Sequence, residues 1–216
     1  MRRLPTIALM LFCALSLADE PKSSIVFADK FESKLGDGWT WTKENPQGWR
    51  IEKNALVIKT APGTIWDKSA ANMLWRSAGK LPDDATWIAE VSVAHKPETE
   101  YEQAGLICSV DDANFFTLNI ELYHGQRSVV SGGRIEGKFG HLGNAEDNDE
   151  TVRLRIAKKG KSVKLQWRQG DEWKTLKEFD FPATGELKIG LHAHGSKSET
   201  DNRWAKFTDF EIRRGE

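Results

Sequence analysis

The sequence predicts an all-β protein, an antiparallel β-sandwich, from three observations. No window of the 216 residues shows a sustained helical period. Short runs that alternate apolar and polar side chains recur along the chain instead, and turn sequences separate them. The length suits a single domain, because all-β sandwiches of about 200 residues commonly fold as one unit.

The N-terminal segment predicts a cleaved secretory signal. Arg2 and Arg3 precede an apolar run from Leu4 to Leu17, and Ala18 provides a small residue at the cleavage position. The run is shorter than the roughly 20 residues that span a bilayer, so we expect no stable membrane insertion. We therefore expect a signal peptide over residues 1–18, a sandwich domain over residues 19–216, and a secreted or periplasmic protein.

The segment from Gly36 to Thr60 contains three of the nine tryptophans. Trp49 and Ile51 share one face of a short strand, which predicts that Trp49 packs in the core. Trp41, and Trp66 further along, lie close to loops rich in glycine and proline, from which an indole ring can stack on a sugar. We expect both to contact a ligand, with packing in the protein as the alternative for each.

Three central segments, residues 86–95, 103–110 and 114–123, show the clearest alternation. Successive side chains of a strand point to opposite sides, so each segment has an apolar face and a mixed face. The apolar set consists of Trp87, Ala89, Val91, Val93, Ala104, Leu106, Cys108, Val110, Phe116, Leu118, Ile120 and Leu122. Cys108 is therefore predicted to be a buried small hydrophobe rather than a reactive thiol.

The C-terminal half predicts a meander of hairpins. Two turn sequences of hairpin length, KKGK and RQGD, separate three alternating runs that begin at Thr151. The run ELKIGLHAHG follows, and the last strand changes its alternation near Asp209, which indicates a β-bulge. The acidic segment 143–150 and the polar segment 196–202 are expected to be loops.

Composition and motif content argue against several classes of function. The formal net charge of -1 argues against nucleic-acid binding, which needs a basic face. Removal of the signal would leave Cys108 as the single cysteine, so no intramolecular disulfide is expected. The sequence contains no G-x-S-x-G, no P-loop and no dinucleotide fingerprint, and we expect no cofactor and no resident metal.

The order of several segments resembles a known family. The segments are FADKFE, GDGWTWTKENPQGWRIEKNALVIKT, EQAGLICSVDDANFFTLNIEL, and the closing pair IGLHAH and AKFTDFEI. This order resembles the concanavalin A-like, laminin-G-like sandwich family related to regulation of enolase proteins and to the C-terminal domains of β-xylosidases. The resemblance implies a jelly roll of two curved antiparallel sheets, a fold frequent in carbohydrate-active proteins whose members often have no established activity.

A set of polar side chains leaves the core on the outward faces of the predicted strands. In a curved sheet such side chains can line one concavity, where amides and carboxylates hydrogen-bond hydroxyl groups and an indole ring stacks on the ligand. We therefore expect a carbohydrate-binding protein with a glycan or polysaccharide ligand. The set consists of Glu90, Ser92, Gln103, Asn119, Glu121, His192 and His194, with Trp41 and Trp66 as stacking surfaces.

Other interpretations stay open from the sequence. A glycoside hydrolase would use Glu121 with a second carboxylate such as Glu90, and the two carboxyl groups would have to lie about 5 to 9 Å apart. A zinc site would use His192 and His194 with Glu121 or His95, and the acidic loop could hold calcium. A structural or interaction domain would present a hydrogen-bonded or solvated sheet face without a sugar site.

Overall fold

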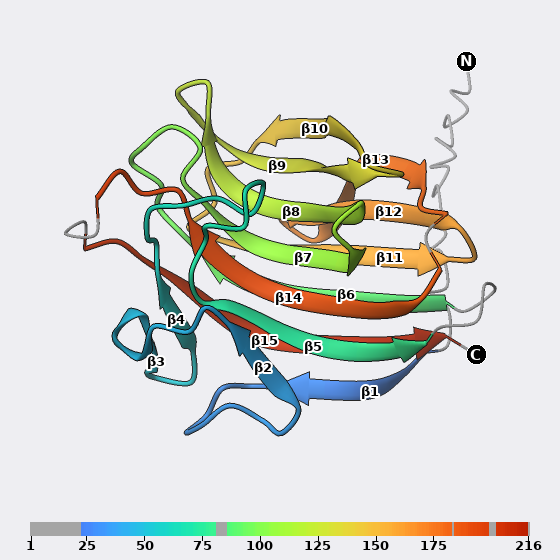
Figure 1. Cartoon of the computed structure of the whole chain (residues 1–216), viewed down its shortest axis with the longest axis horizontal. Coiled ribbons are helices and arrows are strands. Elements are labelled where there is room, and N and C mark those ends of the chain that lie inside the picture. Colours follow the sequence, from blue (N-terminus) through green and yellow to red (C-terminus); the bar gives the residue numbers. More distant parts are fainter. Residues whose placement is uncertain (1–22, 81–85, 183, 199–201, 216) are drawn as a thin grey trace, which may run out of the picture.

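The computed structural model describes residues 23–80, 86–182, 184–198 and 202–215 (Figure 1). Within these residues the chain forms strands, with one short 3₁₀ turn at Pro46–Gly48. All strand pairs are antiparallel and form two sheets, so the predicted β-sandwich is confirmed. The predicted signal peptide lies outside the described residues.

One sheet contains eight strands. In spatial order they are β13 (Glu172–Asp180), β12 (Ser162–Gln169), β11 (Thr151–Lys159), β6 (Thr86–Ala94), β15 (Trp204–Gly215), β4 (Leu56–Lys59) and β3 (Trp49–Ile51), and β1 (Ser23–Asp29) pairs with β15. The long strand β15 therefore holds the sheet together, because its first half pairs with β4 and its second half with β1.

The other sheet contains seven strands and lies in front of the eight-stranded sheet in Figure 1. In spatial order they are β10 (Lys138–Glu146), β9 (Gln126–Ile135), β8 (Asn114–Tyr123), β7 (Gln103–Asp111), β14 (Glu186–His194), β5 (Met73–Lys80) and β2 (Trp39–Thr42). Sequence-distant strands meet at its centre, since β14 pairs with both β7 and β5.

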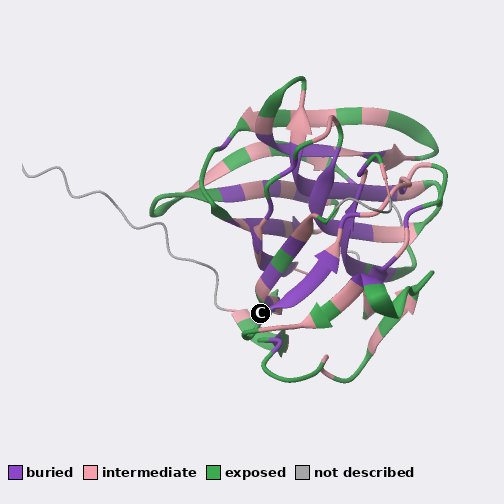
Figure 2. Ribbon diagram, turned by 90° about the vertical axis from the view of Figure 1, so that its left-hand side faces the viewer, coloured by how far each residue is buried: buried purple, intermediate pink, exposed green. Residues whose placement is uncertain are grey.

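The apolar faces of the two sheets pack together and form the core. Most of the inward residues predicted on the central strands are buried as expected, among them Val91, Leu106 and Leu118, each 0% exposed, whereas Val110 and Leu122 at the strand ends are half-buried. Figure 2 shows the buried residues running along the strands of both layers. Cys108 belongs to this core, and burial raises the pKa of its thiol, which confirms that it is a buried hydrophobe.

The predicted hairpins and bulge are confirmed, whereas one predicted loop is partly wrong. Gly160 and Gly170 adopt positive φ angles in the two predicted turns, a conformation that glycine adopts without strain. The register of β15 shifts between Thr208 and Glu211, at the predicted bulge. The segment expected to be an acidic loop from residue 143 contributes its first part to β10, which ends at Glu146.

The connection between β4 and β5 covers the outer face of the seven-stranded sheet, where "outer" means the face turned away from the core. Figure 1 shows this connection, residues 60–72, passing in front of β8, β7 and β14. It forms a second, smaller apolar cluster on the sheet, composed of Ile65, Ala70, Met73, Ile107 and Phe115, with Trp66 and Trp75 against it. Side chains on the outer face are therefore not all in contact with solvent.

In the described part of the chain, no helix has the length and apolar character needed to cross a membrane.

Candidate functional site

Cross-strand pairing brings the polar side chains of the seven-stranded sheet into two adjacent rows on its outer face. Glu121 on β8 lies opposite Gln103 on β7, and Gln103 lies opposite His194 on β14. The next row contains Asn119, Gly105 and His192. Strand alternation directs these side chains away from the core, because their neighbours in sequence, such as Leu106 and Ile120, face inward.

A cavity of about 490 Å³ lies over these rows, and we name it the polar cavity. Five of the predicted ligand-binding residues line it together: Trp66, Gln103, Asn119, Glu121 and His194. The connection after β4 closes one side with Gly63 and Thr64, and the β9–β10 hairpin contributes Phe139 and His141. The volume falls within the range of about 300–1,000 Å³ that is typical of small-molecule sites.

A short amide network holds the floor of the polar cavity. The Asn119 side-chain nitrogen donates to the Gln103 side-chain oxygen at 2.7 Å and to the Thr117 hydroxyl at 3.0 Å. Both Asn119 donors are therefore used within the protein. The Asn119 side-chain oxygen is buried without a hydrogen-bond partner among the described residues, which is uncommon for a buried polar atom.

The Glu121 carboxyl group faces the polar cavity without an ion pair or hydrogen bond to another described residue. Its side chain is 5% exposed. Burial, and to a lesser extent the nearby negative charge of Glu100, raises the pKa of Glu121 to about 8. Glu121 is therefore protonated at neutral pH and presents both a donor and an acceptor.

The two β14 histidines lie beside this floor as neutral imidazoles. His192 and His194 stack with ring centroids 5.1 Å apart, and both are buried. Burial, with a smaller effect of a neighbouring histidine, lowers the pKa of His194 to about 4 and the pKa of His192 well below its ordinary value. His194 lines the polar cavity, whereas His192 lies beneath it and does not reach the lining.

Aromatic side chains form the wall and rim of the polar cavity. The Trp66 ring lies over Gly132, where a Cβ atom would meet the ring at 3.4 Å, and its centroid is 4.6 Å from that of Phe139. Phe139 is 64% exposed, which is high for a large apolar side chain. Tyr123 and His141 stack with their centroids 5.1 Å apart. These rings offer flat apolar surface to a ligand.

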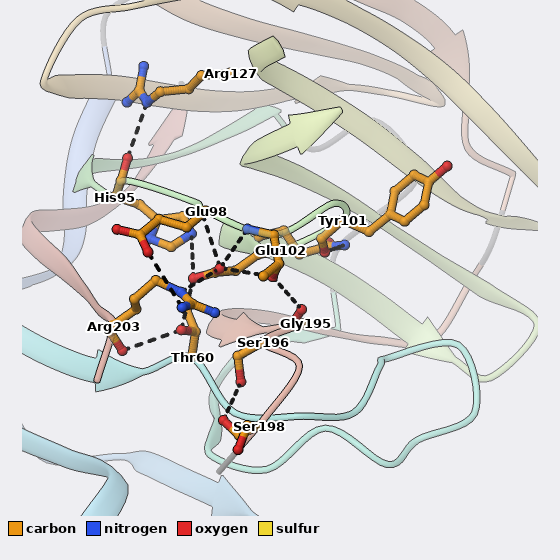
Figure 3. Close-up of polar contacts among 12 residues, drawn as sticks. Thr60, His95, Glu98, Tyr101, Glu102, Arg127, Gly195, Ser196, Ser198 and Arg203 are labelled. Carbon is orange, nitrogen blue, oxygen red and sulfur yellow. Dashed lines mark hydrogen bonds and ion pairs between the residues drawn. The ribbon is translucent and has the colours of Figure 1, made fainter. Parts of the chain in front are cut away.

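A buried carboxylate that the sequence analysis gave no role braces the edge of the site (Figure 3). Glu102 is 0% exposed and accepts hydrogen bonds from the Thr60 hydroxyl at 2.9 Å, the Thr99 hydroxyl at 3.1 Å and the Arg203 Nε atom at 2.7 Å. These partners come from three separate parts of the chain. Its neighbour Tyr101 lines the polar cavity, so the brace fixes one side of the rim. Glu102 belongs to the EQAGL segment, which carries part of the family resemblance. That resemblance was the signal in the sequence that could have pointed to Glu102.

Glu90 and Ser92 are not part of this site, which corrects the expectation of one shared concavity. Both lie on β6 in the eight-stranded sheet, with the core between them and Glu121. Glu90 pairs with Arg153 at 3.0 Å and Arg155 at 2.5 Å. A catalytic pair of Glu90 and Glu121 is therefore wrong, because the two carboxylates face away from each other on opposite sides of the sandwich.

Trp41 packs within the protein and does not line the polar cavity. Its ring lies against Trp49 with the centroids 4.9 Å apart, and both rings pack on the main core. The prediction that Trp49 belongs to the core is confirmed. The neighbouring residues Thr40 and Thr42, which alternate with Trp41 on β2, reach the outer face instead.

The described residues contain no group of three or more histidine, cysteine, aspartate or glutamate side chains that could hold a metal ion. In the expected acidic loop, Asp147 is 2% exposed and lies 3.5 Å from the Arg127 guanidinium. It also accepts a hydrogen bond from the Asp149 backbone at 3.0 Å. Within the expected acidic loop, Asp147 is therefore a buried and paired carboxylate.

The model of a protein family of unknown function, DUF1349, matches residues 41–214. The chain belongs to the DUF1349 family. Curated protein sequences give no match to this DUF1349 chain. The resemblance to regulation of enolase proteins stays a prediction.

Solved structures share the fold of the DUF1349 chain at low sequence identity. The GH43 BlXynB protein from Bacillus licheniformis has a TM-score of 0.73 at 18% identity, over 86% of this chain and 38% of that one. The xylan β-1,4-xylosidase from Bacillus halodurans C-125 has a TM-score of 0.71 at 16% identity, over 92% and 41%. The DUF1349 chain thus spans less than half the length of either protein.

A third similar structure is nearly the same size as the DUF1349 chain. The CBM2 module of the evolved Dit protein of Lactobacillus casei BL23 phage J-1 has a TM-score of 0.64 at 11% identity, over 90% of this chain and 97% of that one. These similarities confirm the predicted β-sandwich fold.

Proposed function

We propose that this DUF1349 protein is an exported, glycan-binding β-sandwich protein whose ligand occupies the polar cavity. The observation that carries the proposal is the set of polar groups at the cavity floor. The Asn119 side-chain oxygen is buried without a hydrogen-bond partner among the described residues, and the Glu121 carboxyl group lines the same cavity. A buried polar group without a partner is costly, and a ligand that supplies the partner recovers that cost.

The character of the lining favours a ligand rich in hydroxyl groups. At neutral pH the Glu121 carboxyl is protonated and the His194 imidazole is neutral, because of the pKa directions given above. Both groups can then donate and accept, as a hydroxyl ligand requires. The rings of Phe139 and Tyr101 are exposed, and Trp66 lines the same cavity. These rings supply the flat apolar surface on which a sugar ring stacks.

The similar structures support a glycan ligand at the level of fold. They include a GH43 protein, a xylan β-1,4-xylosidase and a CBM2 module, and at identities under 25% they carry no residue roles. Binding is favoured over hydrolysis because a glycosidase needs two carboxyl groups at the scissile bond. Among the described lining residues of the polar cavity, Glu121 is the single carboxyl group.

The test is binding of soluble xylan in affinity gels, followed by calorimetric titration with xylohexaose, cellohexaose and mannohexaose. We expect at least one of these ligands to bind. The variants Trp66→Ala and Asn119→Ala should weaken that binding by about tenfold or more, the scale of one lost stacking surface or hydrogen bond to a buried group. Release of reducing sugar in the same mixtures would instead support hydrolysis.

Trp173→Ala is the matched control. Trp173 lies on β13 of the other sheet, where its ring centroid is 3.7 Å from the Arg155 guanidinium carbon. It does not line the polar cavity. Loss of a large ring at this position should leave glycan binding unchanged. Equal binding by the wild type, Trp66→Ala and Asn119→Ala would remove the polar cavity as the site.

A further inference from the structure

A second cavity, of about 350 Å³, lies on the same outer face on the other side of Trp66. Its floor consists of Ile107, Phe115 and Trp75, and Trp66 lines both this cavity and the polar cavity. Arg134 and Lys188 line it as well. We name it the basic cavity.

The sheet is adapted to hold the aromatic floor of the basic cavity. A Cβ atom on Gly190 would lie 2.8 Å from the Trp75 ring and 2.9 Å from the Ile107 side chain, so the Trp75 ring crosses β14 where no side chain intervenes. Phe115 packs against Trp66 with the centroids 5.5 Å apart. The basic cavity therefore has rigid aromatic surfaces on two sides, of the kind on which a second sugar ring can stack.

The strand register places the two cations at opposite ends of one row. Arg134 on β9 lies opposite Phe115, which lies opposite Ser109, which lies opposite Lys188 on β14. The side chains of Arg134 and Lys188 form no hydrogen bond or ion pair with another described residue. Lys188 is exposed and Arg134 is half-buried.

The other charged groups of the basic cavity already have partners. Lys68 pairs with Asp112 at 2.5 Å, which cancels both charges. One oxygen of the Asp111 carboxylate accepts from the Ala113 backbone at 2.8 Å and from the Asn114 side chain at 3.0 Å, within the β7–β8 turn. The side chains of Arg134 and Lys188 therefore face the cavity without partners, whereas the Asp111 carboxylate is hydrogen-bonded within a turn. The lining thus carries a net positive charge.

We propose that the basic cavity binds an acidic sugar residue, one that carries a carboxylate or a sulfate ester, of the glycan chain whose adjoining residue occupies the polar cavity. The inference rests on the proposed function, because Trp66 lines both cavities and neighbouring residues of one glycan chain would occupy them. Arg134 supplies a planar guanidinium that can pair with two oxygens of such a group, and Lys188 supplies a flexible point charge. The ligand class is then an acidic polysaccharide rather than a neutral one.

The experiment compares each acidic ligand with its own neutral form by calorimetric titration. The carboxylate arm uses tetragalacturonate and its methyl ester, and the sulfate arm uses a sulfated galactan oligosaccharide and its desulfated form. We expect one acidic ligand to bind about tenfold more tightly than its neutral form, a difference of about 1.4 kcal/mol. The arm with the preference identifies the acidic group, and the preference should shrink at about 0.5 M salt because ions screen exposed charges.

The double variant Arg134→Gln/Lys188→Gln should abolish the preference, so that the acidic and neutral forms bind with equal affinity. The matched control is Lys161→Gln/Lys177→Gln, which removes two exposed charges from the β11–β12 turn and β13, away from both cavities. Equal affinity for acidic and neutral forms, or a preference that survives Arg134→Gln/Lys188→Gln, would overturn the inference.

The polar-cavity variant Asn119→Ala separates failure of this inference from failure of the proposed function. Equal binding of acidic and neutral forms that Asn119→Ala weakens would overturn the basic cavity and leave the proposed function standing. An acidic preference that Arg134→Gln/Lys188→Gln removes, together with unchanged affinity of Asn119→Ala for both forms, would support the basic cavity and count against the polar cavity. Absence of binding to every ligand, including xylohexaose, would overturn both.

Discussion

The Asn119 amide donates a 2.7 Å hydrogen bond to the side-chain oxygen of Gln103, on the neighbouring strand. This bond determines how the Asn119 amide is turned, because the nitrogen must face Gln103. The side-chain oxygen of Asn119 is then left over Gly105, where a Cβ atom would lie only 2.9 Å from it. Gln103 thus fixes the orientation of the Asn119 amide at the proposed binding site.

Replacement of Gln103 tests this arrangement. Gln103→Ala frees the Asn119 nitrogen, so we expect glycan affinity to fall by about tenfold and the free energy of unfolding to fall by about 1 kcal/mol. Gln103→Glu keeps an oxygen acceptor for Asn119 and should retain more of the affinity. Calorimetric titration and urea unfolding measure the two effects. Equal affinity in the alanine and glutamate variants would show that the acceptor at position 103 does not orient Asn119.

Stability should pass through a maximum near pH 6.5. His95 and His194 have pKa values of about 4 in the fold, and His192 lies well below 6.5, against an ordinary value of 6.5. Between pH 6.5 and about 4 the unfolded chain takes up protons that the folded histidines reject, so stability falls as the pH falls. Above pH 6.5 these three residues contribute a constant amount.

Glu121 produces the opposite slope on the alkaline side. Its pKa rises from 4.5 to about 8 on folding, so the folded protein holds a proton that the unfolded chain releases. Its contribution is complete below pH 4.5 and is lost as the pH rises to about 8, at roughly 1.4 kcal/mol per pH unit. The Glu121→Gln variant should therefore lose the decline between pH 6.5 and 8 while keeping the acid limb. Urea unfolding at pH 5, 6.5 and 8 checks this, and parallel curves for the two proteins would contradict it.

Glu102→Ala should destabilise the protein by about 3–5 kcal/mol, the scale of breaking a buried, hydrogen-bonded ion pair. It removes the acceptor shared by Thr60, Thr99 and Arg203, and it leaves polar groups at the edge of the polar cavity unpartnered. The urea midpoint should fall, with the slope of the transition unchanged if the unfolding remains two-state. A shift no larger than that of a surface change such as Glu172→Ala would show that Glu102 is not a structural brace.

Much of the fold could be predicted because strand alternation reports burial directly. The inward faces of β6, β7 and β8 contain apolar residues at every second position, and no polar residue interrupts them from Ala104 to Cys108. Turn glycines such as Gly160 and Gly170 marked the hairpins. Which sheet each strand joins could not be predicted in this way, because alternation assigns a face within a strand and says nothing about its partners.

That missing information explains the errors at the site. Glu90 and Glu121 show the same outward pattern in the sequence, yet β6 and β8 belong to different sheets. Trp41 and Trp66 both lie near loops, but Trp41 is on the inward face of β2, and Trp66 is carried over the outer face by the connection between β4 and β5. The grouping of Gln103, Asn119, Glu121 and His194 was predictable because their strands are neighbours and their faces agree.

Gly190 provides a test of how the sheet holds the basic cavity. A Cβ atom there would lie 2.7 Å from the Leu74 backbone oxygen and 2.8 Å from the Trp75 ring, so Gly190→Ala forces the β5–β14 pair or the ring to move. We expect a loss of about 1–3 kcal/mol in the free energy of unfolding, together with a change in Trp75 fluorescence. Gly140→Ala is the matched control, since a Cβ atom at that position meets nothing within 4 Å. Equal stability of the two variants would mean that the sheet accommodates a side chain at position 190, and the Trp75 ring would then not depend on the glycine for its place over β14.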